Sequence, residues 1–340
     1  MNLVYACVFY NRDYMKLLEL LLASMKIYSS TDTFDFLVLT SPGFEESLEE
    51  LSSKTGIQIK TMCIPLTTIF EAACARLRIF DYEFISRYDT ILYLDTDILI
   101  KGDLAPLFSL AKDKILYAIE EGTIASKNFG GLLFRPGAFD MKTAGINSGT
   151  LLFQNCLPVR DLFSRIRGHI QGFTDKGEAS PYALDQPFIN YHAIQSGIYD
   201  NKALNPFVSL YEKSDTVTNY ETSVICHFSF PIGNFGHKYN RMKAFFINLL
   251  REPCIEGCEY ENRVKGRQLT WGSGFIEFGQ GRELHTSWGK GEYEIKSPDL
   301  VCAFWNNYFH MLKFNEKFSE CISVRIYPKD CQVSYSKLLK

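Results

Sequence analysis

The sequence predicts an α/β protein with a mostly parallel sheet, followed by a smaller β-rich region. Between Leu3 and Leu94, apolar segments with strand-like and helix-like periodicity alternate, and this order places helices on both faces of a parallel sheet. From about Asn262, short aromatic and β-branched runs are separated by glycines, which is typical of antiparallel hairpins. We therefore expect one domain over residues 1–250 and a small β-rich domain over residues 262–340.

The elements of the larger domain follow from the period of the apolar positions. Strands are predicted over residues 3–9, 34–39, 57–64, 90–94, 146–153 and 224–228, and helices over 14–28, 45–55, 70–87, 159–170 and 185–195. The stretch from Gly122 to Gly145 has five glycines and little periodicity, so we expect a long loop or an insertion there.

Composition excludes several classes of protein. Of the 340 residues, 46% are apolar and 22% charged, which is ordinary for a globular protein, and a net charge of -3 argues against a nucleic-acid partner. The amino terminus has no basic segment followed by an apolar stretch, and apolar runs are interrupted well before the roughly 20 residues of a membrane span. The ten cysteines include no C-x-x-C pair. We expect a cytoplasmic protein with reduced cysteines and no membrane span.

Two carboxylates interrupt the most apolar strand of the chain. The stretch ILYLDTDILI, residues 91–100, carries Asp95 and Asp97 two positions apart, and burying charge in this way is costly. Side chains at i and i+2 of an extended segment point to one side, so the pair can reach a common cation at the carboxyl end of the sheet, where ligands of such sheets bind. The alternative is that both aspartates cap the following turn.

Further polar segments follow in an order that resembles glycosyltransferase family 8, the glycogenin-like enzymes. They are ARLRIF with Arg76, LYLDTDILIKGDLAPLF, INSGTLLF with Asn147, LDQPFIN with Asp185, and HFSFPIGNFGHKYNRM with His227. The resemblance spans about Asn2 to Arg241. It implies a Rossmann-like nucleotide-diphospho-sugar transferase fold of the GT-A type, and transfer that retains the anomeric configuration.

The resemblance also implies roles for individual residues. Asp95, Asp97 and His227 would hold Mn²⁺, or Mg²⁺ in its place, since carboxylates with an imidazole suit manganese better than calcium. Asp185, Gln186 and Lys238 would act at the reacting centre, with Asp185 assigned to donor positioning. The donor, expected to be a UDP-sugar, would contact the residues Val8, Tyr10, Asn11, Tyr14, Arg76, Thr96, Asn147, Ser148, Gly149, Gly233 and Gly236.

The chain departs from the family pattern after the histidine, where a longer loop precedes Lys238 and either Gly233 or Gly236 fills the glycine position. His237 is a competing metal ligand, although a histidine beside a lysine outside a strand is expected to be solvated. Tyr14 either stacks on a base or packs at the start of its helix. The acceptor is expected to be a glycan, and a homodimer is the candidate assembly.

Two other functions remain open at this point. The protein could bind nucleotide-sugars or glycans without catalysis, or it could be a metal-dependent nucleotidyltransferase or phosphohydrolase. The aromatic residues of the β-rich region, among them Trp271, Trp288 and Trp305, either offer platforms to a glycan or form its core, and we favour the core. Two Trp-Gly dipeptides, at Trp271 and Trp288, indicate similar hairpin turns.

Overall fold

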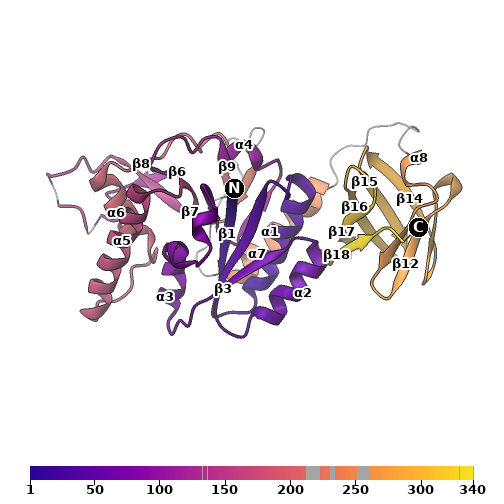
Figure 1. Ribbon diagram of the computed structural model, residues 1–340, viewed down its shortest axis with the longest axis horizontal. Coiled ribbons are helices and arrows are strands. Elements are labelled where there is room, and N and C mark those ends of the chain that lie inside the picture. The colour runs from indigo at the N-terminus through magenta and orange to yellow at the C-terminus, as the bar shows by residue number, and fades with distance from the viewer. Residues whose placement is uncertain are drawn as a thin grey trace.

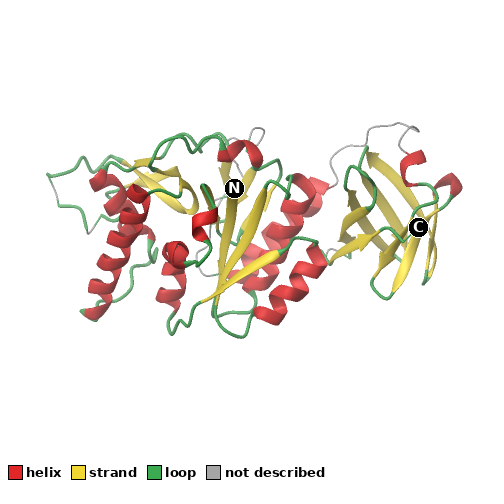
Figure 2. Ribbon diagram, in the orientation of Figure 1, coloured by secondary structure: helices red, strands yellow, loops and turns green. Residues whose placement is uncertain are grey.

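The protein consists of an α/β part and a closed antiparallel sheet that lies beside it (Figure 1, Figure 2). The computed structural model describes residues 1–131, 133–135, 137–211, 223–229, 234–250, 261–328 and 330–339. None of the helices in these ranges combines the length and the apolar composition that a membrane-spanning helix requires. The α/β architecture with a β-rich C-terminal region is thus the one predicted.

The central sheet has seven strands in the order β3-β2-β1-β4-β7-β6-β8. Neighbours β3, β2, β1 and β4 are parallel, whereas β7 is antiparallel to β4 and to β6. The strands are β1 (Asn2–Val8), β2 (Phe34–Thr40), β3 (Ile59–Cys63), β4 (Thr90–Leu94), β6 (Leu116–Thr123), β7 (Ala144–Gln154) and β8 (Tyr199–Asp200). The sheet is therefore parallel in the half that holds the first four predicted strands.

Helices cover both faces of this sheet, as the alternating sequence pattern predicted. Helices α1 (Tyr14–Tyr28) and α2 (Glu45–Thr55) bury leucines against one face, and α5 (Leu157–Asp175) and α6 (Gln186–Ser196) pack on the other. The remaining helices are α3 (Ile69–Cys74), α4 (Ala105–Phe108), α7 (Phe235–Leu250) and α8 (Glu261–Val264).

The predicted helix over residues 70–87 is wrong as a single element. Helix α3 starts at a capping box. The Thr68 side chain accepts a hydrogen bond from the Glu71 backbone N–H, and the Glu71 carboxylate accepts one from the Thr68 backbone N–H. It ends at Cys74 and continues as two 3₁₀ helices, Ala75–Asp81 and Ile85–Arg87. The successive residues Ala75, Arg76 and Leu77 are all buried. An amphipathic α-helix buries side chains along one face only. Because this segment is buried on more than one side, its packing favours a 3₁₀ helix.

A second, three-stranded sheet brings a distant segment to the end of β4. Strand β10 (Ile225–His227) lies between β5 (Ile98–Ile100) and β9 (Val208–Leu210), antiparallel to β5 and parallel to β9. In this register His227 pairs with Ile98. Residues 95–97 form a turn between β4 and β5 rather than the extended segment that the sequence suggested.

The C-terminal region is an eight-stranded antiparallel sheet in which each strand pairs with the next along the chain. Its strands are β11 (Gln268–Trp271), β12 (Gly274–Phe278), β13 (Glu283–Thr286), β14 (Gly289–Ser297), β15 (Leu300–Trp305), β16 (Tyr308–Phe314), β17 (Glu320–Tyr327) and β18 (Val333–Lys337). The last strand returns to the first, because the Leu339 N–H donates to the Gln268 carbonyl at 2.7 Å. The sheet therefore closes on itself around an apolar interior.

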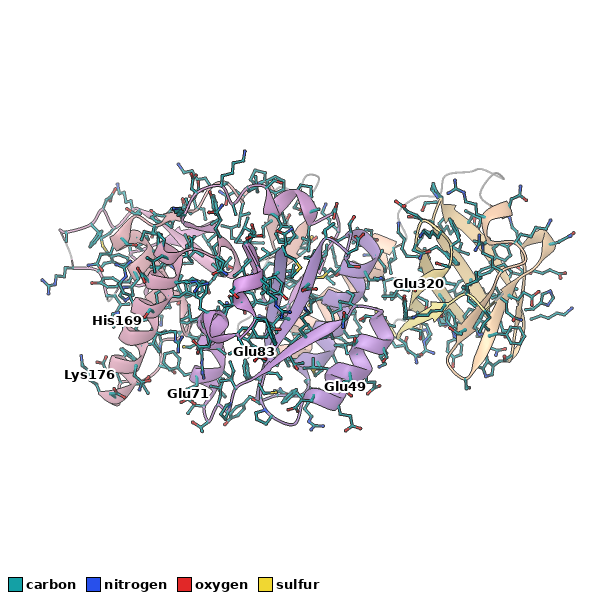
Figure 3. All side chains as sticks on the ribbon, in the orientation of Figure 1. Glu49, Glu71, Glu83, His169, Lys176 and Glu320 are labelled. Atoms are coloured by element: carbon teal, nitrogen blue, oxygen red, sulfur yellow. The ribbon has the colours of Figure 1, made fainter. Side chains whose placement is uncertain are left out.

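The closed sheet and the α/β part share a hydrophobic cluster. Leu17 and Leu20 of α1 and Phe246 of α7 belong to the same buried cluster as Met311 and Val324 of the closed sheet. Glu49 on α2 and Glu320 on β17 lie on the two sides of this junction (Figure 3). The division of the chain into domains over residues 1–250 and 262–340 stays a prediction. Each part has buried clusters of its own, and this further cluster joins them.

Candidate functional site

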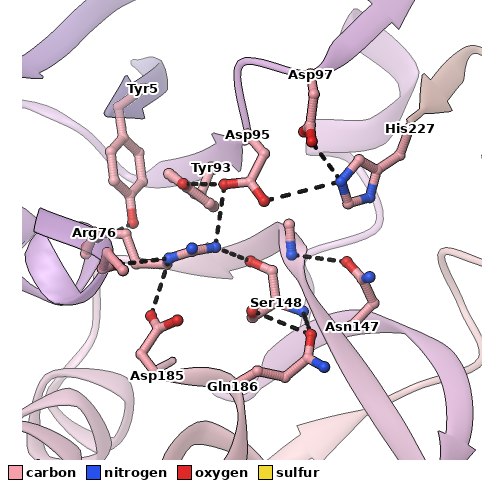
Figure 4. Close-up of polar contacts among 12 residues, drawn as sticks. Tyr5, Arg76, Tyr93, Asp95, Asp97, Asn147, Ser148, Asp185, Gln186 and His227 are labelled. Carbon is pink, nitrogen blue, oxygen red and sulfur yellow. Dashed lines mark hydrogen bonds and ion pairs between the residues drawn. The ribbon is translucent and has the colours of Figure 1, made fainter. Parts of the chain in front are cut away.

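Three side chains converge beyond the carboxyl end of β4. One ligand atom from each of Asp95, Asp97 and His227 can be chosen so that all three lie within 4.8 Å of one another. His227 Nε2 is 3.2 Å from Oδ1 of Asp97 and 3.9 Å from Oδ2 of Asp95 (Figure 4). The backbone fixes this arrangement, since the Phe228 N–H donates to the Asp97 carbonyl at 2.9 Å and joins the turn to the strand of His227.

Gly149 on β7 leaves the space that the three side chains occupy. A Cβ atom at this position would lie 2.2 Å from Cε1 of His227 and 2.7 Å from Oδ2 of Asp95. The Asn147 side chain accepts from the Gly149 N–H at 2.7 Å, and the Asp95 N–H donates to the Gly149 carbonyl at 2.8 Å. The segment Asn147-Ser148-Gly149 thus lies beside the three side chains, and its glycine is required by close approach, while its contact with the donor stays a prediction.

Arg76 links this cluster to Asp185. Its Nη1 donates to the Ser148 carbonyl at 2.7 Å and is 3.2 Å from Oδ1 of Asp95. Its Nε is 3.0 Å from Oδ2 of Asp185, an ion pair without hydrogen-bond geometry, because the Nε hydrogen points to the Ala73 carbonyl. The buried guanidinium therefore places a positive charge between two buried or half-buried carboxylates (Figure 4).

Electrostatics differ sharply between Asp97 and Asp185. Burial opposes the charged form of Asp97, but Lys238, whose Nζ contacts Asp97 Oδ2, and His227 together lower the pKa of this carboxyl well below its usual range. Burial raises the pKa of Asp185 to about 6, although Arg76 partly counteracts it. Asp97 is consequently charged at any physiological pH, whereas Asp185 titrates near neutrality.

Asp185 and Gln186 lie where α6 begins, facing β7. The Gln186 side chain accepts from the Ser148 N–H at 3.0 Å, and Asp185 is almost fully buried at the N-cap of the helix. The first residues of this helix thus contact the same strand segment that carries Gly149. The resemblance stated above implied that Asp185 and Gln186 act at the reacting centre. The structure places Asp185 beside Arg76 and Gln186 beside Ser148, and their roles stay a prediction.

The four residues in and near the loop after β1 that were predicted to contact the donor differ in exposure. Val8 is buried, Tyr10 and Asn11 are exposed at the carboxyl end of the strand, and Tyr10 has a left-handed φ of 67°. Tyr14 is partly buried, with its ring centroid 6.1 Å from that of Phe235, which supports packing at the start of α1. Tyr10 is thus the exposed ring at this loop.

The segment after His227 is described in part. Lys238 is buried in the first turn of α7, and the neighbouring His237 is exposed, as expected for a solvated histidine. Gly236 is exposed in the same turn, with no atom near the position of a Cβ. Thr96 is buried between the two aspartates. Gly233, like Cys254 and Cys258, lies outside the described residues, and the eight described cysteines are free thiols.

Two residues of the site were not predicted from the sequence. The Tyr93 hydroxyl donates to Asp95 Oδ1, and the Arg76 guanidinium lies 4.7 Å from the centroid of the Tyr93 ring. The Asn147 amide donates to Glu121 at 2.8 Å, at the end of β6. Glu121 is the second of two glutamates, Glu120 and Glu121, that follow an apolar run, so the end of the run was a signal that did not distinguish between them. Tyr93 gave none, because an aromatic residue in a buried strand is ordinary.

The site has the properties of a divalent-cation site. Oδ1 of Asp97 is buried without a hydrogen-bond partner among the described groups, Nε2 of His227 faces both carboxylates, and Gly149 leaves room where any side chain would intrude. Two carboxylates with one imidazole form a donor set that Mn²⁺ and Mg²⁺ accept. The residues present therefore fit the cation that the sequence predicted.

Comparison with known proteins identifies the family. The model of glycosyl transferase family 8 matches residues 45–234, more than half of the chain and most of the site described above. The chain belongs to glycosyl transferase family 8. The predicted fold of the GT-A type is confirmed.

Several solved glycosyltransferases resemble the family 8 chain in part. The bifunctional glycosyltransferase WbbM is 12% identical with a TM-score of 0.48, over 70% of this chain and 49% of its own. GlyE of Streptococcus pneumoniae TIGR4 is 20% identical with a TM-score of 0.40, and the match covers 59% of this chain and 45% of GlyE. Mouse xyloside xylosyltransferase 1 is 11% identical with a TM-score of 0.47, and the match covers 68% of this chain and 98% of the mouse protein. This chain therefore matches about half the length of the first two. No curated protein matches it.

Proposed function

We propose that this family 8 protein transfers a hexose from a nucleoside-diphosphate sugar, in the first instance a UDP-sugar, to a hydroxyl group of a glycan, with retention of the anomeric configuration. The observation that supports this most directly is the convergence of Asp95, Asp97 and His227 to within 4.8 Å, inside the stretch that matches the family. Mn²⁺ is the proposed cation, with Mg²⁺ as the substitute.

The cation would be held by Asp95, Asp97 and His227, and when bound it neutralises charge that develops on the departing diphosphate. Lys238 places a cationic side chain beside this position, because its Nζ contacts Asp97. The Asp97 carboxylate keeps the pKa of Lys238 above its usual value, so the ammonium remains charged and available to a phosphate oxygen. We assign Lys238 to stabilising the leaving group.

Asp185 is proposed to position the donor sugar. It lies at the start of α6 beside Gln186, and Arg76 holds its carboxylate from one side. A buried carboxylate at this position can accept hydroxyl protons of a sugar or stabilise positive character at the anomeric carbon. Glu121 and Asn147, which are joined by a hydrogen bond, are proposed to contact hydroxyl groups on the same side.

The test is donor cleavage with a matched pair of histidine variants. The purified protein is incubated with a panel of nucleotide-sugars and Mn²⁺, with EDTA as the negative control, and released nucleoside diphosphate is measured with and without oligosaccharide acceptors. We expect His227→Ala to lose at least about a hundredfold in metal-dependent turnover, because even the loss of a residue that only supports a metal ligand costs about 10–100-fold. His237→Ala, at the exposed neighbour of Lys238, should retain activity.

Two results would contradict the proposal. Release of a nucleoside monophosphate instead of a diphosphate would indicate nucleotidyl transfer or phosphohydrolysis. Tight binding of a nucleotide-sugar with no turnover, in a sample that binds Mn²⁺, would indicate a binding protein.

A further inference from the structure

The closed sheet gathers all three tryptophans of the chain at one end. Successive strands run in opposite directions, so the hairpins β11–β12, β13–β14 and β15–β16 turn at the same end of the sheet. Trp271 and Trp305 are the last residues of β11 and β15, and each is followed by a turn residue with positive φ, Gly272 and Asn306. Trp288 instead lies within its turn, because Thr286 pairs with Gly289, so the two Trp-Gly dipeptides occupy different turn positions.

Two of the three tryptophans belong to the interior. Trp271 and Trp305 are 8% and 5% exposed, with ring centroids 5.2 Å apart in an edge-to-face arrangement. His310 stacks on Trp305 at 4.3 Å, and its Nδ1 is buried without a hydrogen-bond partner among the described groups. The prediction that the aromatic residues form the core is confirmed for this pair.

The third tryptophan does not follow the core prediction. Trp288 is 44% exposed, and Tyr308, on the neighbouring hairpin, is 38% exposed. The Asn306 amide donates to the Trp288 carbonyl at 3.3 Å, which joins the two hairpin turns. We call Trp288, Asn306, Asn307 and Tyr308 the aromatic tip. It combines flat rings with two exposed primary amides.

Charges around the aromatic tip balance one another. Arg325 lies 4.7 Å from the centroid of the Tyr308 ring, but it forms an ion pair with Asp330. Lys290 and Glu292, two positions apart on β14, are both exposed. A ligand of this surface therefore gains nothing from a net charge of either sign.

We propose that the aromatic tip binds a neutral sugar residue of a glycan, as a site additional to the transfer site. A pyranose ring has an apolar C–H face that packs on an indole or phenol ring, and its hydroxyl groups match the donors and acceptors of asparagine amides. A membrane surface is the less suitable partner, because the amides would lose their hydrogen bonds in lipid and the tip has no excess of basic residues. Such a site would hold a glycan close to the enzyme while transfer takes place.

The test measures binding without catalysis. The full-length protein is run in native gels that contain amylose, dextran, mannan or galactan, with EDTA and without a nucleotide-sugar so that no transfer takes place. We expect retardation by at least one polysaccharide, and an increase of about tenfold or more in its dissociation constant for Trp288→Ala. Trp288→Phe should restore part of the binding. Phe84→Ala, at an equally exposed aromatic residue (38%) of the α/β part, should bind like the wild type.

Three results would overturn the proposal: no retardation in any of these gels, equal retardation of the wild type and Trp288→Ala, or Trp288-dependent binding to phosphatidylcholine vesicles without binding to polysaccharide. The last result would assign the tip to a membrane. Failure of donor cleavage in the transferase assay leaves this proposal unaffected, so the two can be judged separately.

Discussion

Among the single residues of the site, Gly149 shows most directly how the cation site depends on space. A methyl group there would overlap the His227 ring and the Asp95 carboxylate, which β7 cannot relieve because its neighbours β4 and β6 hold it on both sides. We expect Gly149→Ala to reduce turnover at least about a hundredfold and to weaken Mn²⁺ binding. Turnover and calorimetric titration with Mn²⁺ measure these two effects.

Gly168→Ala is the matched control for this variant. Gly168 lies within α5, and a Cβ there would meet no atom within 4 Å. This substitution should leave turnover unchanged and raise the free energy of unfolding by about 0.5–1 kcal/mol, since glycine in a helix is entropically unfavourable. Wild-type activity in Gly149→Ala would show that the three side chains do not converge on one ion.

Tyr93 is expected to orient Asp95 rather than to take part in the reaction. Its hydroxyl and the Arg76 guanidinium both approach Oδ1 of Asp95, which leaves Oδ2 directed toward His227. Tyr93→Phe should raise the dissociation constant for Mn²⁺ about tenfold, with much of the turnover regained at saturating Mn²⁺. Electron paramagnetic resonance of free Mn²⁺ measures this affinity independently of turnover.

Tyr88→Phe provides the comparison for Tyr93→Phe. The Tyr88 hydroxyl also donates to a carboxylate, Asp35 at 2.7 Å, but Tyr88 lies just before β4 and Asp35 near the start of β2, away from the site. It should leave the affinity for Mn²⁺ unchanged. An equal loss of affinity in both variants would mean that the hydroxyl of Tyr93 acts only through the stability of the fold.

At the level of secondary-structure elements, the sequence predicted those helices and strands whose apolar residues recur with a regular period. Helix α1 has the predicted bounds because its apolar residues recur at helical spacing, and His227 was placed on a strand for the same kind of reason. The 3₁₀ winding around Arg76 was missed because that segment is buried on more than one side. The contact of Arg76 with Ser148, 72 residues away, is set by packing between elements, and no local pattern contains it.

The capping box of α3 should stabilise the segment that carries Arg76. Thr68→Ala removes the side-chain oxygen that accepts from the Glu71 N–H, so we expect the free energy of unfolding to fall by about 1 kcal/mol. Urea denaturation followed by circular dichroism measures this change. Thr123→Ala, at an exposed position at the end of β6, should have little effect. A loss of equal size in both variants would exclude the cap as the cause.

For the molecule as a whole, the shared hydrophobic cluster makes the two parts depend on each other. A chain that ends at residue 250 would expose Leu17 and Leu20 of α1 and Phe246 of α7, which now pack against the closed sheet. We expect this truncated protein to aggregate or to unfold at a temperature well below that of the full chain, because large apolar surfaces destabilise a soluble fold. Thermal scanning calorimetry compares the two, and an unchanged unfolding temperature would show that the parts are independent.

The closed sheet should lose stability in acid through His310. Burial, with Arg325 nearby, lowers the pKa of this histidine to about 3 from an ordinary value of 6.5. The unfolded chain therefore binds a proton that the folded sheet excludes, and stability falls as the pH decreases from about 6.5 toward 3.

All three tryptophans of the chain lie in this sheet, so their fluorescence during urea denaturation reports on it selectively. His310→Phe keeps a flat ring against Trp305 but cannot take up a proton. It should therefore show a smaller decrease in unfolding midpoint between pH 7 and pH 4 than the wild type, and equal decreases in the two proteins would rule out His310 as the source.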